Sequence, residues 1–146
     1  EPMSRFRTHL ANTPQQVMAL IALAGHPNLR VLLDTFHAAT ELRDYGEAVR
    51  ACADRLWGLH TCENDRGAPG GGLVPWADVF TALRDISFDG YLILETYNTS
   101  LGDFAVRRGV FRDLCPDGAA FARAGFAFLR AQLASYGLPA PERAPG

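Results

Sequence analysis

The chain lacks most of the features that would place a protein in a membrane, a secretory route or a nucleic-acid complex. None of its apolar runs is long enough to cross a bilayer, and its start shows no signal-peptide pattern. The net charge is -2 and no basic patch stands out, which argues against nucleic acid as a partner. Because its three cysteines, Cys52, Cys62 and Cys115, form no CxxC pair, we expect a reduced, cytoplasmic protein.

A phosphate-binding loop is also missing. The glycine-rich tract between Cys62 and Val74 has neither the lysine and hydroxyl residue of a P-loop nor GxGxxG spacing. What remains is ordinary for a globular protein, with 146 residues of which 48% are hydrophobic and 21% charged. This length suffices for one domain with a hydrophobic core.

Short apolar runs alternate with helix signals along the chain. Buried strands are expected at 31–33 and 91–94, and a weaker short strand, which contains a glycine, at 57–61. Helices are expected at 14–24, 44–56, 75–86 and 119–135, with a short one near 106–114 inside a long loop. Thr13 and Gln16 have the spacing of a capping box, and Pro14 suits the first helical position. Since a helix separates each pair of strands, right-handed crossovers predict a parallel sheet.

Each predicted strand has, at its C-terminal end, a residue type that binds metals. Asp34, His60 and Glu95 are separated by 26 and 35 residues, close to the length of one strand–helix–strand unit. Parallel strands end on a common face, which holds the active site in α/β barrels. Taken singly, each residue is more often a cap, core or surface residue, but three in register favour a shared site. Glu1 is a further candidate carboxylate.

Several motifs occur in an order that identifies a family. They are Glu1–Phe6 with Asn12–Thr13, Leu33–His37, His60–Arg66, Pro69–Gly70 before Pro75–Trp76, Asp89–Gly90 before Leu94–Glu95, and Phe111–Asp113. Together they resemble the ketose 3-epimerases (D-tagatose and D-psicose 3-epimerase) of the xylose-isomerase-like barrel superfamily. The resemblance covers nearly the whole chain. It implies an α/β fold that is the C-terminal half of a (β/α)₈ TIM barrel, with parallel strands alternating with helices.

The resemblance also implies a metal site and a reaction. In such enzymes two glutamates, one aspartate and one histidine hold one divalent ion, usually Mn²⁺ or Mg²⁺ and sometimes Co²⁺. The matching positions are Glu1, Asp34, His60 and Glu95, and we expect Mn²⁺ here, with Mg²⁺ or Co²⁺ as alternatives. Glu1 and Glu95 would also be the catalytic acid/base pair. The chemistry suits these residue types, because a metal stabilises the enediolate formed when a proton leaves the carbon beside a ketone. A base on one face and an acid on the other then invert that carbon.

Substrate contacts follow from the same resemblance. His37 and Arg66 occupy matching positions, and Glu63 is a weaker match. Arg7 stands where the family usually has a glutamate, so the identity of the sugar stays open. A phosphorylated or otherwise anionic substrate is one alternative, since arginine binds such groups well.

The resemblance leaves other functions open. One is an aldose–ketose (sugar phosphate) isomerase of the same superfamily, and another is an inactive half-barrel remnant or interaction module. A barrel-type metallo-endonuclease is disfavoured, because the chain has only four histidines and no basic face.

The resemblance also divides the chain into a half barrel at 1–138 and a flexible tail at 139–146. A complete barrel of this kind needs about 250 residues, so we expect a fragment. Alone it would expose open sheet edges and be inactive or nearly so. The expected partners are a sugar substrate and either the missing N-terminal half or further copies in a homo-oligomer, with neither nucleic acid nor membrane involved.

Overall fold

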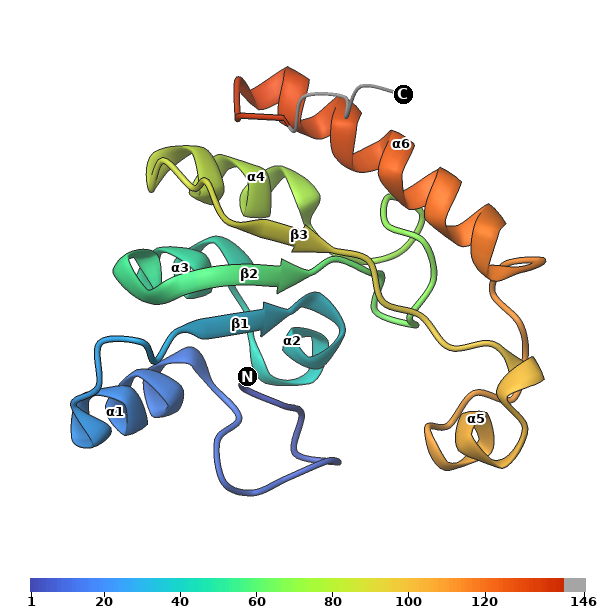
Figure 1. Cartoon of the computed structure of the whole chain (residues 1–146), viewed down its shortest axis with the longest axis horizontal. Helices are drawn as coiled ribbons and strands as arrows, with labels where there is room; N and C mark the ends of the chain where they lie inside the picture. The colour runs from blue at the N-terminus through green and yellow to red at the C-terminus, as the bar shows by residue number, and fades with distance from the viewer. Residues whose placement is uncertain (141–146) are drawn as a thin grey trace.

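The computed structural model describes residues 1–140 as a parallel sheet flanked by helices (Figure 1). Its strands lie side by side in chain order: β1 (Val31–Asp34), β2 (Leu56–His60) and β3 (Tyr91–Ile93). Both neighbouring pairs are parallel, with Asp34 opposite His60 and His60 opposite Ile93. The parallel order predicted from the crossover helices is therefore confirmed, and the three strands end at one edge of the sheet.

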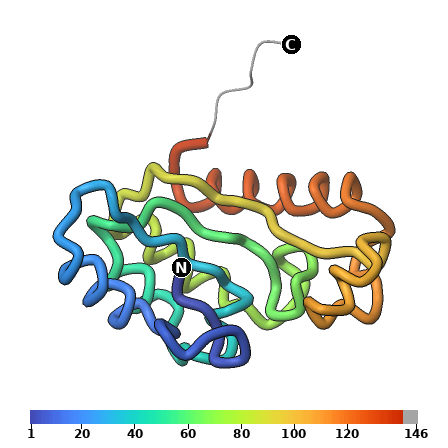
Figure 2. Tube along the Cα trace, turned by 60° about the horizontal axis from the view of Figure 1, so that its bottom comes forward, coloured from blue at the N-terminus to red at the C-terminus, as the bar shows by residue number. Residues whose placement is uncertain are grey.

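In the described part of the chain, six α-helices connect or flank these strands: α1 (Pro14–Ala24), α2 (Thr35–Glu41), α3 (Tyr45–Ala51), α4 (Trp76–Asp85), α5 (Asp103–Arg107) and α6 (Gly118–Tyr136). Short 3-10 turns occur at η1 (Ala53–Arg55) and η2 (Thr99–Leu101). Figure 2 shows α1, α3 and α4 beneath the strands, with α6 beyond β3. Within residues 1–140, none of the helices combines the length and apolar character needed to cross a membrane.

Helix α1 begins and ends where the sequence predicts. The Thr13 hydroxyl accepts the Gln16 N–H, and the Gln16 side chain accepts the Thr13 N–H, which completes the capping box. Gly25 then ends the helix in the left-handed conformation, with φ of 65°. Two local signals therefore fix both boundaries of this helix.

Thr13→Ala is expected to lower the free energy of unfolding by about 1 kcal/mol, because it leaves the Gln16 N–H without its side-chain acceptor. Chemical denaturation of the full-length protein measures this change. Ser135→Ala is the matched control, since it removes a hydroxyl that bonds within α6 but caps nothing. An equal loss in both variants would contradict the capping role.

Other boundaries differ from the sequence prediction. Helix α2 was not predicted, yet it follows β1 directly because the Asp34 side chain caps its first N–H groups. The helix predicted at 44–56 ends at Ala51, and Leu56 already belongs to β2. The short helix expected near 106–114 lies at Asp103–Arg107 instead.

The predicted burial of β3 is wrong, and the predicted tail is only partly described. Tyr91 at the start of β3 is 60% exposed, and so, at 46%, is Trp57 of the central strand β2, whose ring packs against it, so within residues 1–140 this part of the sheet face is left uncovered. Residues 139 and 140 have no regular structure, whereas 141–146 lie outside the described residues.

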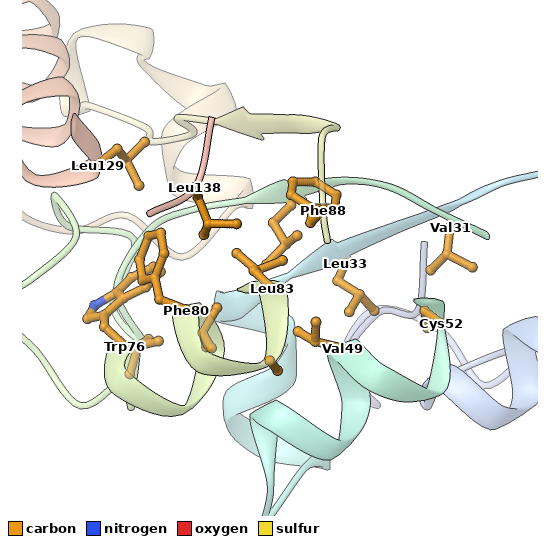
Figure 3. Packing of buried hydrophobic residues seen from close by; sticks show 14 of the residues in the cluster. Val31, Leu33, Val49, Cys52, Trp76, Phe80, Leu83, Phe88, Leu129 and Leu138 are labelled. Atoms are coloured by element: carbon orange, nitrogen blue, oxygen red, sulfur yellow. The ribbon is translucent and has the colours of Figure 1, made fainter. Parts of the chain in front are cut away.

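A single core joins the sheet to the helices beneath it (Figure 3). Phe80 and Leu83 of α4 are fully buried at its centre. The Phe80 ring lies 6.1 Å from that of Trp76 and 5.7 Å from that of Tyr136, between centroids. Burial of these large apolar groups is the main stabilising contribution here. It holds α4 and α6 against the sheet and so fixes the strand ends that carry the candidate site.

Candidate functional site

The strand ends bring the four predicted metal ligands together. The Nδ1 atom of His60 lies 2.9 Å from Glu95 Oε2, 3.2 Å from Glu1 Oε1 and 3.6 Å from Asp34 Oδ2. Asp34 and His60 occupy paired positions at the ends of β1 and β2, and Glu95 follows β3. Glu1 reaches the same point from the N-terminal segment, which lies beside the end of β1 (Figure 1).

The two carboxylate oxygens of Asp34 have different roles: one caps helix α2 and the other faces the candidate site. Its Oδ1 accepts N–H groups from Phe36 and His37 at the start of α2. Its Oδ2 is buried and lacks a hydrogen bond of good geometry, although Arg66 Nη1 lies 2.7 Å away. A buried carboxylate oxygen without a hydrogen bond needs an explanation. Here it faces an imidazole nitrogen and further carboxylates, a donor set that fits a hard divalent cation.

The electrostatics of the cluster favour a positive charge at its centre. The carboxylates of Asp34, Glu1 and Glu95 raise the pKa of His60 to about 11. The His60 contact, together with Tyr97, lowers the pKa of Glu95 to about 2 despite burial. Burial alone would raise the pKa of Asp34, but His60 and positively charged neighbours outweigh it and the pKa is lowered. Asp34 and Glu95 are thus ionised at neutral pH, and the His60 proton supplies a balancing charge whenever no metal ion is bound.

Arg66 and His37, which the resemblance suggests as substrate contacts, lie against the same carboxylates. Arg66 Nη1 is 3.2 Å from Glu95 Oε2, and its Nη2 is 3.5 Å from Nε2 of the buried His37. Burial lowers the pKa of His37, which leaves its ring neutral at pH 7. Arg66 itself has φ of 72°, a left-handed conformation that costs energy for a residue other than glycine. Its guanidinium also stacks 4.3 Å from the centroid of the Phe36 ring.

The structure does not bring Glu63 to the cavity. Its carboxylate accepts the Gly70 N–H at 2.6 Å, the Val74 N–H at 3.1 Å and the Trp76 indole N–H at 2.7 Å. Glu63 is only 2% exposed, and all of these donors belong to the glycine-rich loop or the start of α4. Its geometry is that of a loop anchor, in contrast to the substrate contact suggested by its position in the motif.

Glu63→Gln is expected to destabilise the protein by about 2 kcal/mol, because an amide N–H₂ would replace one acceptor and face backbone N–H donors. Thermal and denaturant unfolding of the full-length protein measure the change. Glu47→Gln on the surface of α3 is the control and should alter stability by less than about 0.5 kcal/mol. A selective rise in the substrate KM of Glu63→Gln with native stability would contradict the anchoring role.

A cavity of about 270 Å³ opens beside the cluster, and its wall contains residues that the motifs did not single out as contacts. The lining residues are Glu1, Met3, Arg7, Phe36, His37, His60, Arg66, Glu95, Tyr97 and Arg108. The Tyr97 hydroxyl donates to Glu95 Oε1 at 2.5 Å. The sequence could have indicated Tyr97 as a site residue, because it lies two residues after Glu95 in an extended segment, where alternate side chains point in the same direction. Arg108 follows the last residue of α5, and no local sequence pattern would have indicated that it lies at the site.

Comparison with known proteins places this arrangement in a family. Residues 1–132 match the family model of the xylose isomerase-like TIM barrel. The chain is 37% identical to D-psicose 3-epimerase of Agrobacterium fabrum over 114 residues, which cover 78% of this chain and 39% of that protein. A solved L-ribulose 3-epimerase gives a TM-score of 0.86 at 30% identity, covering 98% of this chain and 50% of the other.

A second solved structure is similar to this chain in fold. D-psicose 3-epimerase from Clostridium cellulolyticum H10, solved with D-tagatose, gives a TM-score of 0.80 at 32% identity. The match covers 89% of this chain and 46% of that one. The chain therefore spans half or less of the length of these relatives.

Proposed function

The chain belongs to the xylose isomerase-like TIM barrel family, and from this we propose that it forms the C-terminal, metal-binding half of an enzyme that inverts C3 of a ketose. The observation that carries the proposal is the convergence of Glu1, Asp34, His60 and Glu95 on one point. The relatives described above, named as 3-epimerases of ketoses, support it. The remaining strands, from the same polypeptide or another, would pair with the open edge of β3.

Glu1, Asp34, His60 and Glu95 would hold one divalent cation, for which we propose Mn²⁺, with Mg²⁺ or Co²⁺ as alternatives. Three carboxylates and one imidazole suit such ions, and the buried Oδ2 of Asp34 is free of good hydrogen bonds. When bound, the cation would polarise the ketone oxygen and stabilise negative charge on the neighbouring oxygens.

Glu1 and Glu95 would move the proton at C3. The low pKa of Glu95 keeps its carboxylate ionised at neutral pH, ready to accept a proton, and Tyr97 holds its other oxygen in place. One glutamate takes the C3 proton, and the C–H electrons pass into an enediolate over C2 and C3. The other glutamate, once protonated, returns a proton to the opposite face of C3. The roles exchange when the reaction runs in reverse.

Arg66 and His37 would orient the sugar. Ion pairs with Asp34 and Glu95 fix the Arg66 guanidinium, so that it need not be ordered when substrate binds. The neutral His37 ring lies beside it within the cavity wall. Both side chains can hydrogen-bond to the substrate oxygens that gain negative charge during the reaction.

The test uses the full-length protein with free ketohexoses and added Mn²⁺. Appearance of the C3 epimer, detected by chromatography, supports the proposal, whereas formation of aldoses would indicate an aldose–ketose isomerase instead. A calorimetric Mn²⁺ titration runs in parallel. If the protein neither binds Mn²⁺ nor converts any sugar, the chain is a catalytically inactive half barrel and the proposal is wrong.

A further inference from the structure

Two arginines that the proposed reaction does not use line the same cavity. Arg7 comes from the N-terminal segment and Arg108 from the end of α5, yet both contribute to one wall together with Tyr97. Within residues 1–140, neither guanidinium lies within 4.0 Å of a carboxylate, in contrast to Arg5, Arg50 and Arg66. We refer to Arg7 and Arg108 as the rim arginines.

The rim arginines are held in place without an anionic partner. Nη2 of Arg7 donates to the backbone carbonyl of Arg108 at 3.3 Å. The guanidinium of Arg108 lies 4.9 Å from the centroid of the Phe104 ring and 5.8 Å from that of Tyr97. Stacking of this kind leaves the N–H groups at the guanidinium edge available for a ligand. The Arg7 side chain thus lies against the backbone of Arg108, and both exposed guanidinium groups keep donors that no carboxylate of residues 1–140 uses.

The charges of the cavity wall would not balance once a divalent cation is bound. Within residues 1–140, the three carboxylates of the cluster, from Glu1, Asp34 and Glu95, face three guanidinium groups, those of Arg66, Arg7 and Arg108. These charges cancel, so a bound divalent cation would leave two positive charges in excess. An anionic group on the ligand would neutralise this excess, which a neutral sugar does not.

Tyr97 links the rim arginines to the carboxylate cluster. Its hydroxyl bonds to Glu95 at the reacting end, and its ring centroid lies 5.8 Å from the guanidinium carbon of Arg66 and of Arg108 alike. Arg108 therefore lies near the same ring that contacts Glu95 through its hydroxyl. In an extended ketohexose C6 is three carbon–carbon bonds from C3, roughly 4 Å away. With C3 at Glu95, a sugar oriented along the Tyr97 ring would bring its C6 substituent toward the rim arginines.

We propose that the rim arginines bind a terminal anionic group on the substrate, a carboxylate or phosphate at the end of the ketose remote from C2. The inference rests on the proposed C3 epimerisation for the placement of the sugar. Guanidinium groups recognise both oxyanions through paired, charge-assisted N–H···O bonds. The enzyme would then prefer an acidic ketose to the free sugars on which its named relatives act.

The first experiment compares kcat/KM for D-fructose, D-fructuronate and D-fructose 6-phosphate in the full-length, Mn²⁺-loaded protein. We expect kcat/KM for at least one anionic ketose to exceed that for D-fructose by about 30-fold or more. D-Fructuronate tests recognition of a carboxylate, and D-fructose 6-phosphate tests recognition of a phosphate. Arg7→Gln and Arg108→Gln should each reduce the anionic-to-neutral ratio about tenfold, the value of one charge-assisted contact. Arg107→Gln, an exposed neighbour outside the cavity, is the matched control and should leave the ratio unchanged.

A binding experiment without turnover separates this inference from the proposed reaction. D-Glucitol, D-gluconate and D-glucitol 6-phosphate lack a ketone and are titrated calorimetrically into the same variants. Tighter binding of an anionic compound, lost in Arg7→Gln and Arg108→Gln but kept in Arg107→Gln, supports the inference even if no sugar is epimerised. If free ketoses are epimerised while anionic and neutral compounds bind equally, the inference is wrong and the proposed reaction stands.

Discussion

Asp34→Asn is expected to lower Mn²⁺ affinity at least about 100-fold and to abolish activity, while helix α2 stays in place. The amide oxygen of asparagine can still accept the Phe36 N–H that Oδ1 accepts now, so the helix cap is retained. The oxygen that faces His60 and Arg66 is replaced by an uncharged N–H₂ group, which cannot bind a cation. Calorimetric Mn²⁺ titration of the full-length protein measures affinity, and circular dichroism checks the fold.

Asp44→Asn is the matched control for this variant. Asp44 caps the seven-residue helix α3, as Asp34 caps the seven-residue helix α2, and it accepts the Glu47 N–H at 2.7 Å. It is exposed and lies outside the cavity wall. Its variant should bind Mn²⁺ like the native protein. Native affinity in Asp34→Asn, or equal losses in both variants, would remove Asp34 from the metal site.

The parts of the fold that short-range signals encode were predictable from the sequence. The capping box at Thr13 and the left-handed Gly25 fixed α1 at both ends. The alternation of apolar runs and helices was enough to give parallel strands. It also put Asp34, His60 and Glu95 at one edge, because side chains at the ends of parallel strands must approach one another. Helix α2 could not be predicted in this way, because seven residues are too few to show a helical apolar periodicity and its cap, Asp34, is also the last residue of β1.

The parts of the site that depend on long-range packing were not predictable in the same way. Glu63 and Arg66 lie in the same motif, yet their side chains point to different places. The carboxylate of Glu63 turns into the loop, while the left-handed backbone at Arg66 directs its guanidinium toward Asp34. Arg108 reaches the cavity only because α5 folds back against Tyr97. Sequence periodicity predicts only local structure, so it could not predict a contact between residues 101 positions apart, such as that of Arg7 with Arg108.

Glu95→Gln is expected to reduce epimerisation by about 10²–10⁴-fold, the usual contribution of a positioned acid or base. Glutamine keeps the size of the side chain and an oxygen for the Tyr97 hydroxyl but cannot accept the C3 proton. Because Glu95 also faces the proposed metal, Mn²⁺ occupancy must be measured on the same sample. The rate is then compared at saturating Mn²⁺ with that of Glu47→Gln, an exposed glutamate on α3 that should behave like the native protein.

Isotope exchange in D₂O distinguishes a lost base from a merely disturbed site. In Glu95→Gln, Glu1 can still remove the C3 proton from the epimer whose C–H bond faces it and return a deuteron to the same face. This variant should therefore exchange one epimer without inverting it, and Glu1→Gln should exchange only the other. The prediction follows from two carboxylates that meet at His60 from different segments of the chain. If both variants exchanged the same epimer, a single base would serve both faces, and inversion would need a proton donor other than these two glutamates.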